Sequence, residues 1–138
     1  MRLVSDFDGV WTDPSQEAAR VKELFFDLAI SRSGLPASTL RSHFIKAEKD
    51  VRDHPSKNGW LAKSRISAFA DEDGFIFNNG LAAWLDKNSD FSPSRGWTFQ
   101  ELVFQAYQKM TEEVMASNHS TPIVPETRPV LSQLLERL

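Results

Sequence analysis

The chain has 138 residues, close to the length of one typical domain. Its hydrophobic fraction of 41%, with ten Phe and four Trp, can fill a core, so the composition argues against intrinsic disorder. A net charge of −3 with interspersed signs argues against nucleic acid as a partner, and the absence of cysteine leaves no disulfide framework and no thiolate metal ligand. The amino terminus lacks a signal-peptide pattern and no apolar run approaches membrane-spanning length, so we expect a soluble, cytoplasmic protein with no membrane partner.

The first predicted element is a short buried strand at Leu3-Val4, which leads into Asp6-Phe7-Asp8-Gly9. Residues two apart on a strand share a face, so Asp6 and Asp8 begin on one side, and Gly9 lets the backbone turn tightly beside a ligand. One carboxylate of such a pair can act as a nucleophile, and the other can act as a general acid and then as a base. The pair also suits Mg²⁺, although the same pattern is typical of a plain polar turn.

The longer run Asp6-Phe7-Asp8-Gly9-Val10-Trp11-Thr12-Asp13 resembles the first motif of phosphatases in the haloacid dehalogenase (HAD) superfamily. The resemblance implies that Asp6 forms an aspartyl-phosphate and that Asp8 is the general acid/base. It also implies that backbone amides of Phe7, Asp8 and Gly9 bind the phosphate, and that Mg²⁺ is held by the Asp6 carboxylate and the Asp8 carbonyl. An Asp at the second position implies hydrolysis of a small phosphorylated metabolite, or phosphate transfer between sugar hydroxyls as in a phosphomutase.

Two amphipathic helices are predicted next, at the start of a long helical region. The first begins at Pro14, where Thr12 or Asp13 can cap it, and ends at Gly34. The second begins near Pro36 and ends before His54-Pro55. Apolar residues recur at helical spacing in both, namely Val21, Leu24, Phe25 and Leu28 in the first and Leu40, Phe44, Ala47 and Val51 in the second.

The middle of the chain carries weaker signals. Residues 60–69 are predicted to form a shorter segment that continues the helical region. The run Asp71-Glu72-Asp73-Gly74 repeats the D-x-D-G spacing without a clean strand before it, and we interpret it as a polar turn. The next six residues are interpreted as a helix-capping turn, with the alternative of a loop in which Asn78 and Asn79 contact substrate hydroxyls.

Two further helices are predicted in the second half of the chain. One is marked by Leu81, Trp84 and Leu85, and the clearest of all spans residues 98–117. The apolar stripe of the latter consists of Phe99, Leu102, Val103, Ala106, Met110 and Val114. The aromatic residues Phe99, Phe104 and Tyr107 on this helix are interpreted as core rather than as a ligand platform. After a polar linker, residues 122–138 resemble the helix by which HAD chains re-enter their core.

These elements predict an α/β protein of the HAD type. Residues 1–13 and 122–138 form incomplete segments of the core in this prediction, and residues 14–121 form an inserted helical cap. The Ser/Thr, Lys and acidic pair of the later HAD motifs do not follow, so we expect the amino-terminal portion of a longer enzyme. The alternative from another class is a non-catalytic helical interaction module that retains the motif as a relic. Substrate identity and oligomeric state stay open.

Overall fold

The computed structural model describes residues 14–63, 65–88 and 96–117, together with residues 129, 132 and 133. The predicted strand at Leu3-Val4, the Asp6-Phe7-Asp8-Gly9 motif and most of the predicted core re-entry helix lie outside these segments. The fold described below is therefore that of the part predicted to be the cap.

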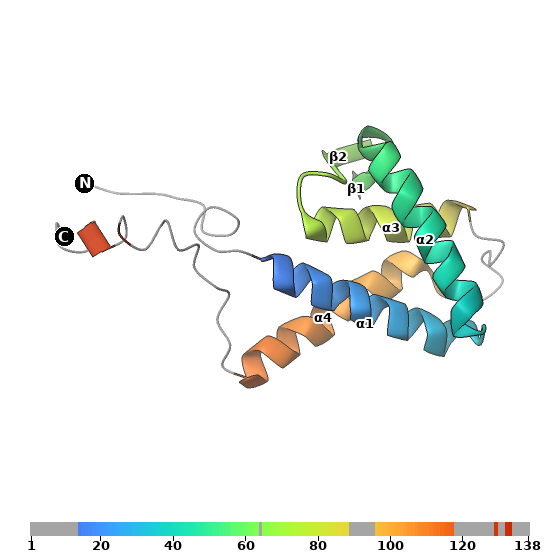
Figure 1. Cartoon of the computed structure of the whole chain (residues 1–138), viewed down its shortest axis with the longest axis horizontal. Coiled ribbons are helices and arrows are strands. Elements are labelled where there is room, and N and C mark those ends of the chain that lie inside the picture. The colour runs from blue at the N-terminus through green and yellow to red at the C-terminus, as the bar shows by residue number, and fades with distance from the viewer. Residues whose placement is uncertain (1–13, 64, 89–95, 118–128, 130–131, 134–138) are drawn as a thin grey trace.

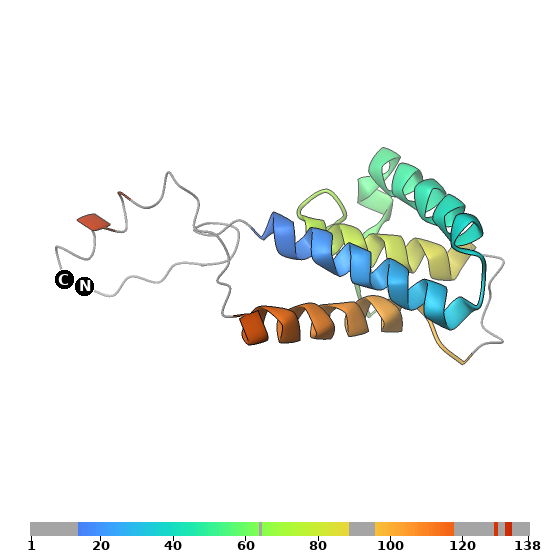
Figure 2. The same ribbon diagram turned by 60° about the horizontal axis from the view of Figure 1, so that its bottom comes forward.

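The described part is mostly helical, with one small antiparallel sheet (Figure 1). In chain order its elements are α1 (Ser15–Ser33), α2 (Ala37–Asp53), the 3₁₀ turn η1 (Pro55–Lys57), β1 (Gly59–Ala62), β2 (Arg65–Phe69), α3 (Gly74–Asn88) and α4 (Phe99–Ser117). Helices α1 and α4 run antiparallel to each other with α3 packed against both, and α2 packs mainly on α3 (Figures 1 and 2). Helices and strands are thus combined, but the described residues show no HAD-like core.

The bounds of the first two helices lie close to their prediction, but α1 begins at Ser15, with Pro14 at the N-cap position and no side-chain cap bond, and not at Pro14 capped by Thr12 or Asp13. Gly34 follows the end of α1 with a φ of 65°, and its N–H donates to the carbonyl of Ile30 at 3.3 Å. A left-handed residue at this position is easiest for glycine, because it has no Cβ, and the bond satisfies a carbonyl of the last turn. Helix α2 begins directly after Pro36 and ends at Asp53, before the predicted His54-Pro55 break.

The start of α4 is held by two sets of side-chain bonds. Thr98 and Glu101 form a capping box, in which the Glu101 N–H donates to Thr98 Oγ1 at 3.1 Å and the Thr98 N–H donates to Glu101 Oε2 at 2.9 Å. The carboxylate of Asp86, near the end of α3, accepts the N–H groups of Phe99 at 2.7 Å and Gln100 at 3.1 Å. Burial raises the pKa of Asp86, while these two bonds oppose the rise. The end of α3 thereby orients the start of α4.

The predicted apolar faces meet in one core. The ring of Phe25 on α1 lies 5.0 Å from the ring of Phe44 on α2 and 6.2 Å from that of Phe99 on α4, measured between centroids. A large apolar side chain that is fully buried contributes roughly 1.5–3 kcal/mol, so this contact of three helices is central to stability. No helix among the described segments is both long and apolar enough to cross a membrane.

The helix predicted over residues 60–69 is wrong, because this segment forms a β-hairpin. Strands β1 and β2 pair antiparallel, with Gly59 opposite Phe69 and Trp60 opposite Ala68, and the register shifts after Trp60. Four to five residues of mixed apolar and polar character can suit either structure, and periodicity alone does not distinguish them. The pairing of the two segments across a short turn decides in favour of strands.

The interpretation of residues 75–80 as a capping turn or loop is also wrong, because they lie inside α3. The polar turn predicted at 71–74 is confirmed for residues 71–73, whereas Gly74 is already the first residue of α3, and the turn supplies the cap of this helix. Asp73 Oδ1 accepts the N–H of Ile76 at 2.7 Å, and Glu72 Oε1 accepts the N–H of Phe69 at 2.6 Å. One run of acidic residues therefore ends the hairpin and begins the helix.

Candidate functional site

The predicted catalytic residues lie outside the described segments. Asp6 and Asp8, with the phosphate-binding amides of Phe7, Asp8 and Gly9, precede residue 14. Their roles in catalysis, phosphate binding and Mg²⁺ binding therefore stay predictions. Among the described residues, no group of three or more His, Asp or Glu side chains comes together in a way that could hold a metal ion.

The structure does show where the chain enters and leaves the helical part. Arg20, in the second turn of α1, donates Nε to Glu113 Oε2 at 2.7 Å and Nη2 to Glu113 Oε1 at 2.8 Å. Glu113 lies one turn before the end of α4, so this two-bond contact joins the first residues of the helical part to its last ones. The hydrogen bond from Arg20 lowers the pKa of Glu113 below its ordinary value. Both ends lie on the same side of the molecule (Figure 2).

Asn78 and Asn79, the predicted substrate contacts, lie side by side on α3 but have different environments. Asn78 is 1% exposed, and its Nδ2 donates to the carbonyl of Ala18 in α1 at 2.8 Å. This bond fastens the start of α3 to the start of α1. Asn79 is half-buried, and its Nδ2 donates to the Phe75 carbonyl at 3.0 Å and to Tyr107 Oη at 2.9 Å. A substrate contact stays a prediction for both, and the position of Asn79 beside a groove favours it over Asn78.

Tyr107 on α4 completes a small network with Asn79. Its hydroxyl donates to the Phe75 carbonyl at 2.7 Å, and its ring lies 5.7 Å from the Phe75 ring. Burial and the negative charge of Asp73 raise the pKa of Tyr107 well above its ordinary value, although the bond from Asn79 acts in the opposite direction. The hydroxyl therefore stays protonated at neutral pH, and its single proton is used within the protein.

These residues line a groove of about 620 Å³ between the hairpin, the start of α3 and the middle of α4. We call it the aromatic groove. Its walls contain the aromatic residues Trp60, Phe75, Phe104 and Tyr107, the apolar residues Ile76 and Met110, and the polar residues Asp73, Asn79 and Gln100. No lysine, arginine or histidine is among the described residues that line it. The groove is thus rich in π-faces and hydrogen-bond acceptors.

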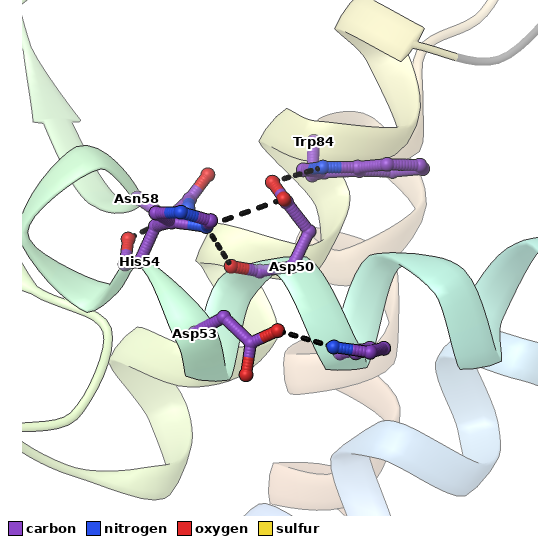
Figure 3. A network of polar contacts seen from close by, with 6 residues as sticks. Asp50, Asp53, His54, Asn58 and Trp84 are labelled. Carbon is purple, nitrogen blue, oxygen red and sulfur yellow. Dashed lines mark hydrogen bonds and ion pairs between the residues drawn. The ribbon is translucent and has the colours of Figure 1, made fainter.

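A second polar cluster lies at the end of α2 (Figure 3). Asp50 Oδ2 accepts Trp84 Nε1 at 2.7 Å, and Asp50 Oδ1 lies 3.3 Å from His54 Nδ1. The Nδ2 of Asn58 donates to the His54 carbonyl at 2.9 Å. A carboxylate beside an imidazole is typical of nucleophilic catalysis only where a third, nucleophilic group meets the ring. Here the carboxylate binds an indole N–H instead, so the cluster fastens α2 to α3 and is not a candidate catalytic site.

Comparisons of the chain with known protein families, with curated proteins and with solved structures give no match. The HAD resemblance therefore stays a prediction from the sequence motif at Asp6-Phe7-Asp8-Gly9.

Sequence reasoning did not find the aromatic groove. Phe99 is buried, as expected for core, but Phe104 is 62% exposed, so its assignment to the core is wrong. The signal was present in the spacing, because Phe104 falls outside the stripe formed by the buried residues of α4. Trp60 gave no such signal, since its segment was expected to be helical and it is 57% exposed on a strand.

Proposed function

We propose that the chain contributes the first catalytic motif and the helical cap of a HAD-type phosphatase. The activity proposed is Mg²⁺-dependent hydrolysis of a phosphate monoester, with Asp6 as nucleophile and Asp8 as general acid and then base. Asp6 and Asp8 would hold the Mg²⁺, whose charge would offset that of the phosphate. Oxygen ligands of this kind are those that Mg²⁺ prefers.

One structural observation carries this proposal beyond the motif. The helical part begins and ends on one side, where the Arg20–Glu113 contact holds α1 and α4 together. An insertion into another domain requires neighbouring entry and exit points, so that the host fold is not pulled apart. Residues 14–117 meet that requirement, and they follow within a few residues of Asp8. An inserted cap in this position can close over the reacting phosphate and exclude water.

The reaction would proceed in two displacements. A carboxylate oxygen of Asp6 attacks phosphorus and the bond from phosphorus to the ester oxygen breaks, while Asp8 donates its proton to the leaving alcohol. Asp8, now a carboxylate, takes a proton from a water molecule that attacks the aspartyl-phosphate. Inorganic phosphate leaves, and Asp6 is regenerated with Asp8 protonated again. Each step is a phosphoryl transfer that depends mostly on positioning and charge stabilisation.

The test is substitution of the two aspartates in the full product of the gene, assayed with a phosphate monoester and Mg²⁺. Asp6→Asn should abolish phosphoenzyme formation, because the amide is no nucleophile. Asp8→Asn should lower turnover by about 10²–10⁴-fold, the usual contribution of general acid–base catalysis. Asp71→Asn is the matched control, since Asp71 begins the second D-x-D-G run in an exposed turn and should leave turnover unchanged.

The proposal fails if Asp6→Asn keeps more than about a tenth of the hydrolysis, a loss far too small for removal of a nucleophile. It also fails if Asp71→Asn lowers turnover as much as Asp6→Asn does. In that case the second acidic run, and not the first, would carry the chemistry.

A further inference from the structure

The aromatic groove exposes side chains that the fold itself does not need. Trp60 is 57% exposed and Phe104 is 62% exposed, and both line this one groove from different elements. Single exposed apolar residues are ordinary on protein surfaces, but several that converge on a concave site with polar groups are typical of ligand binding. The groove therefore calls for an explanation in terms of a ligand.

Its polar groups restrict the charge of that ligand. The hydroxyl proton of Tyr107 is donated to the Phe75 carbonyl, and the amide nitrogen of Asn79 donates to the same carbonyl and to Tyr107. The donors of Tyr107 and Asn79 are thus used within the protein, while the amide oxygen of Asn79 and the Asp73 carboxylate remain acceptors. No basic residue among those described lines the groove, so an anion such as phosphate meets no positive side chain there, whereas a cation meets the Asp73 carboxylate.

The Asp73 carboxylate gives the groove a negative charge. One of its oxygens caps α3 through the Ile76 N–H at 2.7 Å. Burial raises the pKa of Tyr107 on the groove wall, and the charge of Asp73 acts in the same direction. A carboxylate beside several aromatic faces is the chemistry that binds an alkylated ammonium ion, because the rings attract the cation while contacting its methyl groups.

We propose that the aromatic groove binds an organic ammonium cation of the choline type, through the rings of Trp60, Phe75, Phe104 and Tyr107 and the carboxylate of Asp73. The assignment of a substrate class rests on the proposed phosphatase function: if that function holds, the substrates would be phosphate esters of amino alcohols. The cation of such an ester would occupy the groove. Cation binding itself does not depend on Asp6.

The experiment titrates the full 138-residue chain with choline and follows ring-proton and indole NMR signals. The neutral isostere 3,3-dimethylbutan-1-ol is titrated in parallel, because it has the same shape without the charge. Choline should give saturable shifts, and the isostere should bind at least several-fold more weakly. Trp60→Leu and Phe104→Leu should each weaken choline binding by about 2- to 30-fold, the range expected for loss of one cation–π contact.

Asp73→Asn separates charge from structure, because asparagine also caps a helix. It should weaken choline binding several-fold and leave binding of the isostere unchanged. Asp71→Asn and Phe69→Leu are the matched controls: both replace exposed residues of the same region that do not line the groove, and both should bind choline as the wild type does. Asp6→Asn should also keep full affinity, so failure of the phosphatase proposal would not be confused with failure of this one.

Three outcomes would overturn the inference. The first is the absence of saturable shifts with choline up to tens of millimolar, which corresponds to no useful affinity. The second is equal binding of choline and its neutral isostere, which would make the groove a plain apolar site. The third is equal weakening by Asp71→Asn and Asp73→Asn, which would reduce the effect to net charge. Circular dichroism of each variant shows whether it is folded.

Discussion

Tyr107 joins two helices and also forms part of the aromatic groove. Its hydroxyl is bonded to the start of α3 while its ring forms part of the groove wall. Burial and the nearby charge of Asp73 both disfavour the phenolate, so its pKa lies well above the ordinary 10.0. Because Tyr107 is the one tyrosine of the chain, its titration can be followed without interference from another tyrosine.

We expect the phenolate absorbance of the native protein to appear well above pH 10.0, or only as the protein unfolds. The unfolded chain ionises near the ordinary value while the folded one keeps its proton. Stability from this group is therefore fully present below pH 10.0 and is lost as pH rises above it. Tyr107→Phe should be less stable at neutral pH but should not show this additional loss.

The measurement is an ultraviolet titration of the native chain, repeated in concentrated urea as the control. In urea the midpoint should return to the ordinary value. A native midpoint at or below 10.0 would show that Tyr107 is neither buried nor close to the Asp73 carboxylate as described.

At the scale of elements, the hairpin depends on one glycine. Gly59 begins β1 with a φ of +148°, and a Cβ at this position would lie 2.0 Å from the Ala68 carbonyl oxygen of the paired strand. No real Cβ tolerates such a distance to backbone, so the strands must separate if the residue is larger. Gly34 provides a comparison, since it has a φ of +65° but open space around a Cβ.

Gly59→Ala should therefore lower the free energy of unfolding by more than about 2 kcal/mol, as a backbone clash adds to the unfavourable dihedral. Gly34→Ala should cost about 1 kcal/mol, which is the price of a left-handed conformation alone. Urea unfolding of both variants gives the comparison. A Gly59→Ala cost no larger than that of Gly34→Ala would mean that the hairpin register is different from the one described.

The same elements show what could be predicted from the sequence. The stretches of helical periodicity in α1, α2 and α4 are long. Gly34, Pro36 and Thr98 mark ends of these helices, so local signals were sufficient to predict them. The hairpin was missed because its two strands are recognisable only through their pairing. The start of α3 was missed because Phe75, Asn78 and Gly80 are poor helix formers, and contacts with α1 and α4 outweigh their preferences. The aromatic groove was missed because its residues come from three elements, which only the tertiary fold brings together.

At the scale of the whole molecule, the described residues of the helical part form one continuous core. Its buried cluster contains residues from Val21 to Met110, drawn from all four helices and from Ala70 after the hairpin. Among the residues that the structure describes, the side chains of this cluster come from between the entry point at 14 and the exit point at 117. A unit of this kind can fold without help from flanking segments, which is what an inserted domain requires.

We therefore expect a fragment of residues 14–117 to fold alone. It should keep the helical circular dichroism of the full chain and unfold cooperatively, with a midpoint temperature within a few degrees of that chain, because it keeps every residue of the described core cluster. A second fragment that ends at residue 96 is the control. It lacks α4 and with it Phe99, Leu102 and Val103, which are 1–2% exposed in the core, so it should lose cooperative unfolding. If the 14–117 fragment is instead unfolded, flanking residues stabilise the helical part, and its interpretation as an inserted cap loses its main structural support.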